Sequence, residues 1–147
     1  IEKIGYKYAM SNIQAALCLA QLKRIKELVS KRRKIFKWYQ SNLKSLKNIQ
    51  LNKEVHPAKS IYWMTSIFIR RSKKKRVTAN YLSKKLKDEL IDTRPVFPSI
   101  STYPMWKTKN NFFSKELSKY SLNLPSGHNL KREEVKYICN NIIKILK

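Results

Sequence analysis

The chain has 147 residues, of which 42% are hydrophobic, so it is long enough for one domain with its own apolar core. No apolar run approaches the ~20 residues that span a lipid bilayer, and two cysteines are too few for a disulfide-stabilised secreted scaffold. The charge is the unusual property: 33 Lys and Arg side chains against nine Asp and Glu give a formal net charge of +24.

This positive charge has two interpretations. It indicates a polyanionic partner, such as nucleic acid or an anionic membrane surface. It also fits a chain whose composition is rich in Lys, Asn and Ile, with lysines spread over solvated helix faces. Both interpretations remain open from the sequence.

The two cysteines, Cys18 and Cys139, fall on apolar-periodic helices and lack zinc-ligand spacing. We therefore expect buried thiols in a reducing compartment, the cytoplasm. The sequence starts at Ile1 and its first methionine is Met10, so we expect it to be a piece of a longer protein.

A single helix is predicted from residue 11 to about residue 46, because neither Pro nor Gly interrupts an apolar repeat of three and four residues. Ser11 is its predicted N-cap, since the hydroxyl can accept from a free backbone N–H of the first turn. At about 1.5 Å per residue this helix would be about 50 Å long. Its other face is basic, and we interpret that face first as the solvated back of a core helix and alternatively as a surface for a membrane or a phosphate backbone.

Strands are predicted next at 49–51 and at 61–69, where aromatic and β-branched residues dominate the second segment. The run that follows, residues 70–76, carries six cations in seven residues. We interpret it as a solvated turn rather than a nucleic-acid patch, because no aromatic residues interleave to stack bases.

Helices and extended segments alternate in the second half, with Thr78 and Asn129 as the predicted caps of its first and last helices. This order predicts an α+β fold with a small, mainly antiparallel sheet covered by helices on one side. The predicted segments are a helix from 78 to 90, an extended segment at 91–98, a loop at 99–106, a helix at 111–119, an extended stretch at 122–127 and a helix at 130–146.

Taken alone, the residues carry little chemistry. No two of the nine acids share one face of a predicted element, which argues against a two-carboxylate or two-metal site, and His56 and His128 have no cysteine or acid at ligand spacing. Two glycines are too few for a phosphate-cradling loop. The pattern by itself indicates a basic α+β domain without a metal site.

Four segments in chain order nevertheless resemble the DegT/StrS-type sugar aminotransferases, enzymes that use pyridoxal phosphate. Residues 5–22 are similar to G-Y-N-Y-R-M-(S/T)-x-x-Q-A-A-x-G-x-x-Q-L. The other three resemble the perosamine-synthase branch: residues 61–64 its Y-W-M strand, residues 92–105 its D-T-R-P-x-F and S-T-x-P-M, and residues 124–135 its L-P-S-G-H-N-L-T-x-E-E-V.

The resemblance implies the C-terminal small domain of a fold-type I aminotransferase. Residues 1–10 would form an active-site turn that reaches the partner subunit, 11–46 the long helix and 47–147 a small α+β subdomain. It also implies a homodimer with a shared active site, in which glutamate donates an amino group to a 4-keto-6-deoxy sugar on a nucleoside diphosphate. The large domain with the pyridoxal phosphate and its Schiff-base lysine is expected outside this sequence, so no residue here is nominated as catalytic.

By the same resemblance, Lys7 would contact the cofactor phosphate in the partner subunit. Arg94, Tyr103 and His128 would bind the sugar nucleotide, with the guanidinium of Arg94 pairing with diphosphate oxygens or, alternatively, forming a surface ion pair.

The chain departs from the family pattern in its first segment, where Lys7 stands in place of Asn and Ala9 in place of Arg. A point charge thus replaces an amide donor, and one cation is lost. These departures give one alternative to an active enzyme, an inactive aminotransferase relic. The net charge of +24 and the 70–76 run give a second, a non-catalytic basic module that binds nucleic acid or an anionic surface.

Overall fold

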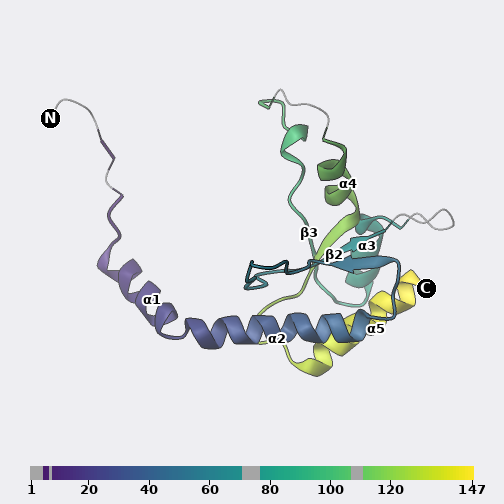
Figure 1. The fold of residues 1–147 in the computed structure, drawn as a ribbon, viewed down its shortest axis with the longest axis horizontal. Coiled ribbons are helices and arrows are strands. Elements are labelled where there is room, and N and C mark those ends of the chain that lie inside the picture. Colours follow the sequence, from purple (N-terminus) through teal and green to yellow (C-terminus); the bar gives the residue numbers. More distant parts are fainter. Residues whose placement is uncertain (1–4, 7, 71–76, 107–110) are drawn as a thin grey trace.

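The computed structural model describes residues 5–6, 8–70, 77–106 and 111–147. Figure 1 shows a long helix below a small sheet, with a second helix crossing under it and the N-terminal segment extending away. The described elements are α1 Asn12–Lys23, α2 Ile25–Leu43, β1 Ile49–Leu51, β2 Thr65–Ile69, α3 Ala79–Asp88, β3 Arg94–Pro95, a 3-10 helix Ile100–Thr102, α4 Phe112–Tyr120, β4 Ser121–Leu124 and α5 Arg132–Leu146.

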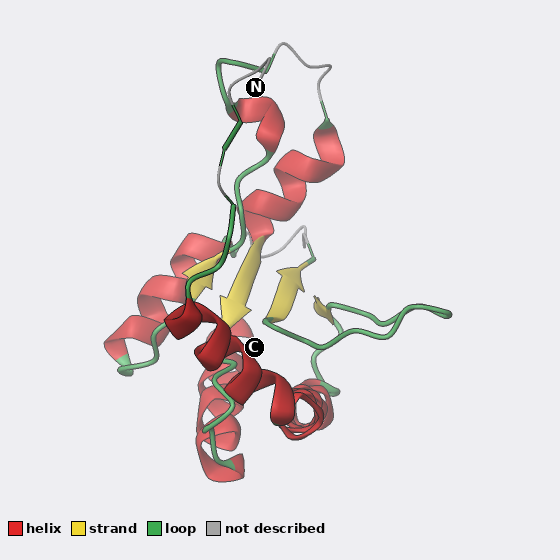
Figure 2. Ribbon diagram, turned by 90° about the vertical axis from the view of Figure 1, so that its left-hand side faces the viewer, coloured by secondary structure: helices red, strands yellow, loops and turns green. Residues whose placement is uncertain are grey.

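The four described strands form one antiparallel sheet in the order β1-β2-β4-β3. The register places Ile67 of β2 opposite Leu51 of β1 and Leu122 of β4, so apolar side chains of neighbouring strands share one face. Figure 2 shows the strands together at the centre of the molecule. The predicted α+β fold with a small antiparallel sheet is therefore confirmed.

The core lies between that face of the sheet and the helices α2, α3 and α5. Tyr39 of α2, Leu82 of α3 and Ile142 of α5 are each 0% exposed. Tyr39 also donates its hydroxyl to the carbonyl oxygen of Pro125 at 2.9 Å, so its polar atom has a partner inside the core. These contacts fix α2 and α5 against the end of β4, where the candidate site lies.

The predicted single helix over 11–46 is wrong, because two helices meet at Arg24, whose backbone (φ −106°, ψ 6°) leaves the helical region. Ser11 is the N-cap of the first, as predicted: Ser11 and Gln14 form a reciprocal capping box. The helix α1 buries no side chain, and the apolar residues on it face solvent. Cys18 is consequently exposed, contrary to our expectation, whereas Cys139 is buried as predicted.

The end of α3 has a Schellman motif with leucine where glycine is usual. Leu90 stands just past the helix with a left-handed backbone (φ 58°), and its side chain is 97% exposed. Its N–H donates to the carbonyl of Lys87 at 3.0 Å, and the N–H of Ile91 donates to the carbonyl of Leu86 at 2.9 Å. The predicted cap at the other end of α3, Thr78, accepts from the N–H of Tyr81 as expected.

Two predicted boundaries also differ. The strand β2 begins at Thr65 rather than residue 61, because Tyr62 adopts a left-handed conformation (φ 47°) that turns the chain. The helix α5 begins after Lys131 rather than Asn129, and its first turn is closed by Glu134, which accepts from the N–H of Lys131 at 2.7 Å.

Most of the basic run at 70–76 lies outside the described residues, so its interpretation as a turn stays a prediction. Over the part of the chain that the structure covers, none of the helices has the length and apolar character needed to cross a bilayer.

Candidate functional site

A hollow of about 920 Å³ opens where the carboxyl end of β4 meets the start of α5 and the turn after α3. Three of the four motif segments contribute to its wall, which brings together residues that are distant in sequence. The lining residues are Arg32, Trp63, Met64, Glu89, Leu90, Ile91, Asp92, Arg94, Asn123, Leu124, Pro125, Ser126, Gly127, Asn129, Leu130, Glu133, Glu134, Tyr137 and Ile138.

Arg32 of α2 holds the wall of this hollow together. Its Nη1 donates to the carbonyl oxygen of Trp63 at 2.6 Å and to that of Ser126 at 3.2 Å. We had placed Arg32 on the solvated back of a helix, but its side chain is half-buried and bonded to two loops. The apolar periodicity of the sequence could not predict this contact, because its acceptors are backbone carbonyls, which every residue has.

Ser126 ties the L-P-S-G-H-N-L turn to the first residue of β2. Its hydroxyl accepts from the N–H of Thr65 at 2.8 Å and donates to the carbonyl of Leu124 at 2.8 Å. The hydroxyl is therefore fully used as both acceptor and donor within the turn. Ser126 is a positioning residue of the hollow that the motif contained but that the sequence analysis did not single out.

Arg94 lies on β3 at the rim of the hollow. Its Nη2 is 3.0 Å from a carboxylate oxygen of Asp92, and both side chains are about three-quarters exposed. The surface ion pair that we gave as the alternative for Arg94 is present. An exposed pair of this kind contributes little to stability and is easily exchanged for another anion.

Tyr103 lies outside the wall of this hollow, on the loop that leads to α4. A cluster of short side chains anchors that loop: Ser114 of α4 donates its hydroxyl to Ser99 at 2.7 Å, and the Thr102 hydroxyl donates to the Ser99 carbonyl at 2.6 Å. Tyr103 follows this anchor directly and remains 43% exposed. The sequence analysis identified Tyr103 but missed Ser99 and Ser114, which fix its backbone.

The remaining predicted site residues are His128 and Lys7. His128 is exposed in the turn before α5 and is not among the residues that line the hollow, although its neighbours Gly127 and Asn129 are. Lys7 lies outside the described residues, so its predicted contact with a cofactor phosphate stays a prediction. Over the described part of the chain, no three His, Cys, Asp or Glu side chains gather as metal ligands would.

The hollow is not by itself a site for pyridoxal phosphate. No lysine is among its described lining residues, so it offers no amine for a Schiff base. Its charged groups are two guanidiniums and four carboxylates, which can bind and orient a polar ligand. The described lining of this hollow therefore offers groups that can bind a polar ligand, but no amine for a covalent link to a cofactor.

Comparison with solved structures defines the class of this fold. PseC of Helicobacter pylori, an aminotransferase involved in the biosynthesis of pseudoaminic acid, superposes with a TM-score of 0.85 at 21% identity, covering 99% of this chain and 40% of that one. DesV of S. venezuelae superposes with a TM-score of 0.84 at 18% identity, covering 99% and 39%. The chain thus has the fold of about two-fifths of each of these proteins.

Sequence comparison then establishes the family. Residues 1–143 match the DegT/DnrJ/EryC1/StrS aminotransferase family, and the chain belongs to it. It is 39% identical over 141 residues to GDP-perosamine synthase of Escherichia coli O157:H7, and 34% identical over 143 residues to the enzyme of that name in Vibrio cholerae. These alignments cover 95% of this chain but 37% and 38% of the two relatives. The resemblance seen in the four motifs is confirmed, and the chain spans less than two-fifths of these relatives.

Proposed function

We propose that the chain is the C-terminal portion of a pyridoxal-phosphate-dependent aminotransferase that acts on a 4-keto-6-deoxy sugar of a nucleoside diphosphate. The amino group of glutamate would be exchanged for the carbonyl oxygen at C4 of the sugar, which converts glutamate to 2-oxoglutarate. The observation that carries this proposal is the family match over residues 1–143, with perosamine synthases among its relatives.

In this proposal the pyridoxal phosphate supplies the electron sink for the exchange, and its lysine lies in a part of the enzyme beyond residues 1–147. The described residues act on the substrate side. Arg94, at the rim of the hollow, exchanges Asp92 for a diphosphate oxygen, while Tyr103 and His128 contact the sugar nucleotide from their loops. Lys7 contacts the cofactor phosphate across a homodimer, which we place in the cytoplasm.

The proposal is tested with the complete gene product, including any residues outside 1–147. Purified enzyme is mixed with glutamate and GDP-4-keto-6-deoxymannose, and formation of 2-oxoglutarate and of the amino sugar is followed by coupled assay and mass spectrometry. We expect both products in equal amounts and an absorbance spectrum typical of bound pyridoxal phosphate. A folded dimer that neither binds the cofactor nor forms either product would overturn the proposal.

A further inference from the structure

A second concave surface runs along one flank of α2. It consists of two adjoining hollows of about 860 and 700 Å³, which share Arg33 and Lys37 in their linings. Its walls are α2, the edge strand β1 and the loop over residues 52–62. We call it the α2 groove.

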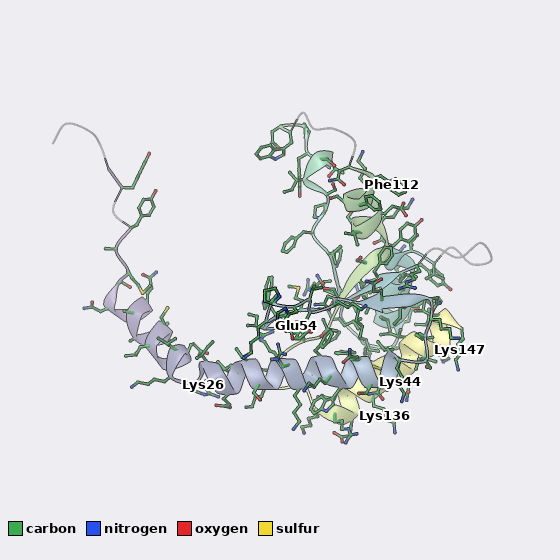
Figure 3. The ribbon with its side chains drawn as sticks, in the orientation of Figure 1. Lys26, Lys44, Glu54, Phe112, Lys136 and Lys147 are labelled. Atoms are coloured by element: carbon green, nitrogen blue, oxygen red, sulfur yellow. The ribbon has the colours of Figure 1, made fainter. Side chains whose placement is uncertain are left out.

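Figure 3 shows Lys26 near one end of α2 and Lys44 near the other, with Glu54 above the middle of the helix. At about 1.5 Å per helical residue, Lys26 and Lys44 are separated by about 27 Å along the axis.

The lining of the α2 groove is strongly cationic. Glu54 is the one acid among its described lining residues, and its carboxylate is 2.6 Å from Nη1 of Arg33. The cationic lining residues come from α2 and its C-cap, from the loop and from the end of β2: Lys26, Arg33, Lys34, Lys37, Lys44, Lys53, Lys59 and Arg70.

The charge is distributed unevenly over the molecule. The hollow at β4 and α5 is lined by four acids, among them Glu89 and Glu133, and by two arginines. A lysine-rich composition alone would place cations around both surfaces to a similar extent. The separation of acids from cations therefore supports a charged ligand for the α2 groove rather than an incidental charge.

The walls of the α2 groove are fixed before any ligand binds. Arg33 donates to both carboxylate oxygens of Glu54 and to the carbonyl of Ser60, and Glu54 accepts from the N–H of Ser60 at 2.6 Å. The rings of Phe36 and Tyr62 stack with centroids 3.7 Å apart. These contacts hold the 52–62 loop on α2. The loop therefore loses little conformational entropy when a ligand binds.

The stacking of Phe36 on Tyr62 also indicates which class of polyanion the groove can bind. Phe36 and Tyr62 are the aromatic side chains of the described lining, and they are 4% and 7% exposed, so neither offers a free face to a base. Proteins that bind single-stranded nucleic acid use exposed rings for this purpose. The remaining ring of the described lining is the single exposed imidazole of His56, so the groove offers cations along its length but no series of rings on which successive bases could stack.

We propose that the α2 groove binds an extended polyanion without bases, a chain of regularly spaced phosphate or carboxylate groups, through the lysines of α2 and of the facing loop. Binding is electrostatic and salt-dependent, because neutralising the polymer releases its counterions. This site is separate from the hollow assigned to the sugar nucleotide, and it does not depend on the aminotransferase reaction.

The test uses the complete gene product and two polymers, inorganic polyphosphate and polygalacturonate, with binding measured by titration calorimetry between about 50 and 200 mM salt. The groove variant is Lys34→Gln, Lys37→Gln and Lys44→Gln. The matched control is Lys84→Gln, Lys87→Gln and Lys136→Gln, which removes the same charge from exposed positions of α3 and α5. Glutamine is a good helix former, so both variants keep their helices, as circular dichroism will verify.

We expect the groove variant to bind at least about tenfold more weakly, with a shallower salt dependence, and the control to stay within about twofold of the parent. Tighter binding of either polymer supports the proposal and identifies phosphate or carboxylate as the natural anion. Equal losses in the two variants, no binding at low salt, or tighter binding of a single-stranded oligonucleotide of equal charge would each overturn it.

Discussion

Arg32 and Ser126 are 94 positions apart in the chain, yet Nη1 of Arg32 donates to the backbone carbonyl oxygen of Ser126 at 3.2 Å. The same nitrogen donates to the carbonyl of Trp63 at 2.6 Å. One guanidinium thus joins α2, the segment before β2 and the turn before α5, three of the elements that line the hollow. The shape of the candidate site depends on this arginine more than on any residue that the motifs emphasise.

Replacing Arg32 tests that dependence. Arg32→Ala leaves the part-buried carbonyl of Ser126 and the exposed carbonyl of Trp63 without a charged donor, so we expect the free energy of unfolding to fall by about 1–2 kcal/mol. The measurement is the urea midpoint at constant m-value. Lys31→Ala, whose ammonium makes an exposed ion pair with Glu27, is the control and should change stability by less than about 0.5 kcal/mol. Equal effects of the two variants would contradict the assignment.

Leu90 offers a stabilising substitution. Its left-handed backbone (φ 58°) is strained for a residue with a Cβ, and its side chain is 97% exposed, so Leu90→Gly loses almost no burial. We expect a gain of about 0.5–1 kcal/mol in thermal or urea unfolding. Lys87→Gly, inside α3, should instead destabilise by about 1 kcal/mol. A loss of stability in Leu90→Gly would show that the leucine side chain makes contacts elsewhere in the native protein.

Stability at low pH should depend on Glu54. Hydrogen bonds from the Arg33 side chain and from the backbone of Ser60 lower the pKa of Glu54 from 4.5 to about 2. Because the folded-state pKa lies below the unfolded value, the stabilisation is complete above pH 4.5 and is lost as the pH falls toward 2.

The measurement is the unfolding midpoint of the parent chain and of Glu54→Gln across that pH range. The difference between the two chains should shrink as the pH falls. A constant difference at every pH would contradict the proposed role of the Glu54 carboxylate.

Arg94 should act on substrate binding in the complete enzyme. Arg94→Ala removes the proposed diphosphate partner, so we expect KM for the sugar nucleotide to rise about tenfold or more, with a smaller effect on kcat. Asp92→Asn is the matched control, because it removes the ion pair but keeps the guanidinium. It should leave KM unchanged or lower it. A rise in KM in both variants would indicate a disturbed β3 strand rather than a lost substrate contact.

The two departures from the family pattern can be reversed together. Lys7→Asn with Ala9→Arg restores the family residues, and the added guanidinium should strengthen cofactor binding by about tenfold in the complete dimer, as one charge-assisted hydrogen bond would. Cofactor affinity by absorbance titration is the measurement, and Ala15→Arg with Lys23→Asn on α1, which likewise adds one guanidinium and removes one lysine, is the matched control. An unchanged affinity would argue against the relic alternative, because Lys7 and Ala9 would then not have lowered the affinity for the cofactor.

The sequence predicted those features that depend on local chemistry. Ser11 and Thr78 cap helices because hydroxyls at those positions satisfy free N–H groups, and the apolar period placed Leu82 and Ile142 in the core. The break at Arg24 could not be predicted, because no Pro or Gly marks it and the apolar pattern continues through it. An apolar pattern shows that a helix face can pack against another apolar surface. It does not show whether residues 1–147 contain a segment that packs there.

The candidate site was predicted in part for the same reason. The motifs identified Arg94 and the L-P-S-G-H-N-L turn, which the fold brings to one hollow. Arg32 and Ser99 were missed because their main partners are backbone carbonyls and small hydroxyls, which carry no recognisable spacing. The sequence predicted only part of the α2 groove. It predicted the basic face of the helix, but not the loop that the ion pair between Arg33 and Glu54 holds opposite that face.

The exposed helix α1 has a practical consequence. A helix of 12 residues without a buried side chain is only marginally stable in water, so its amide protons should exchange faster than those of α2. Cys18 projects from this helix, whereas burial raises the pKa of the Cys139 thiol to about 12 and leaves it unreactive. Within residues 1–147, Cys18 is thus the cysteine that a thiol-reactive dye can reach, and docking of another surface onto α1 would change the fluorescence of that dye and slow the exchange.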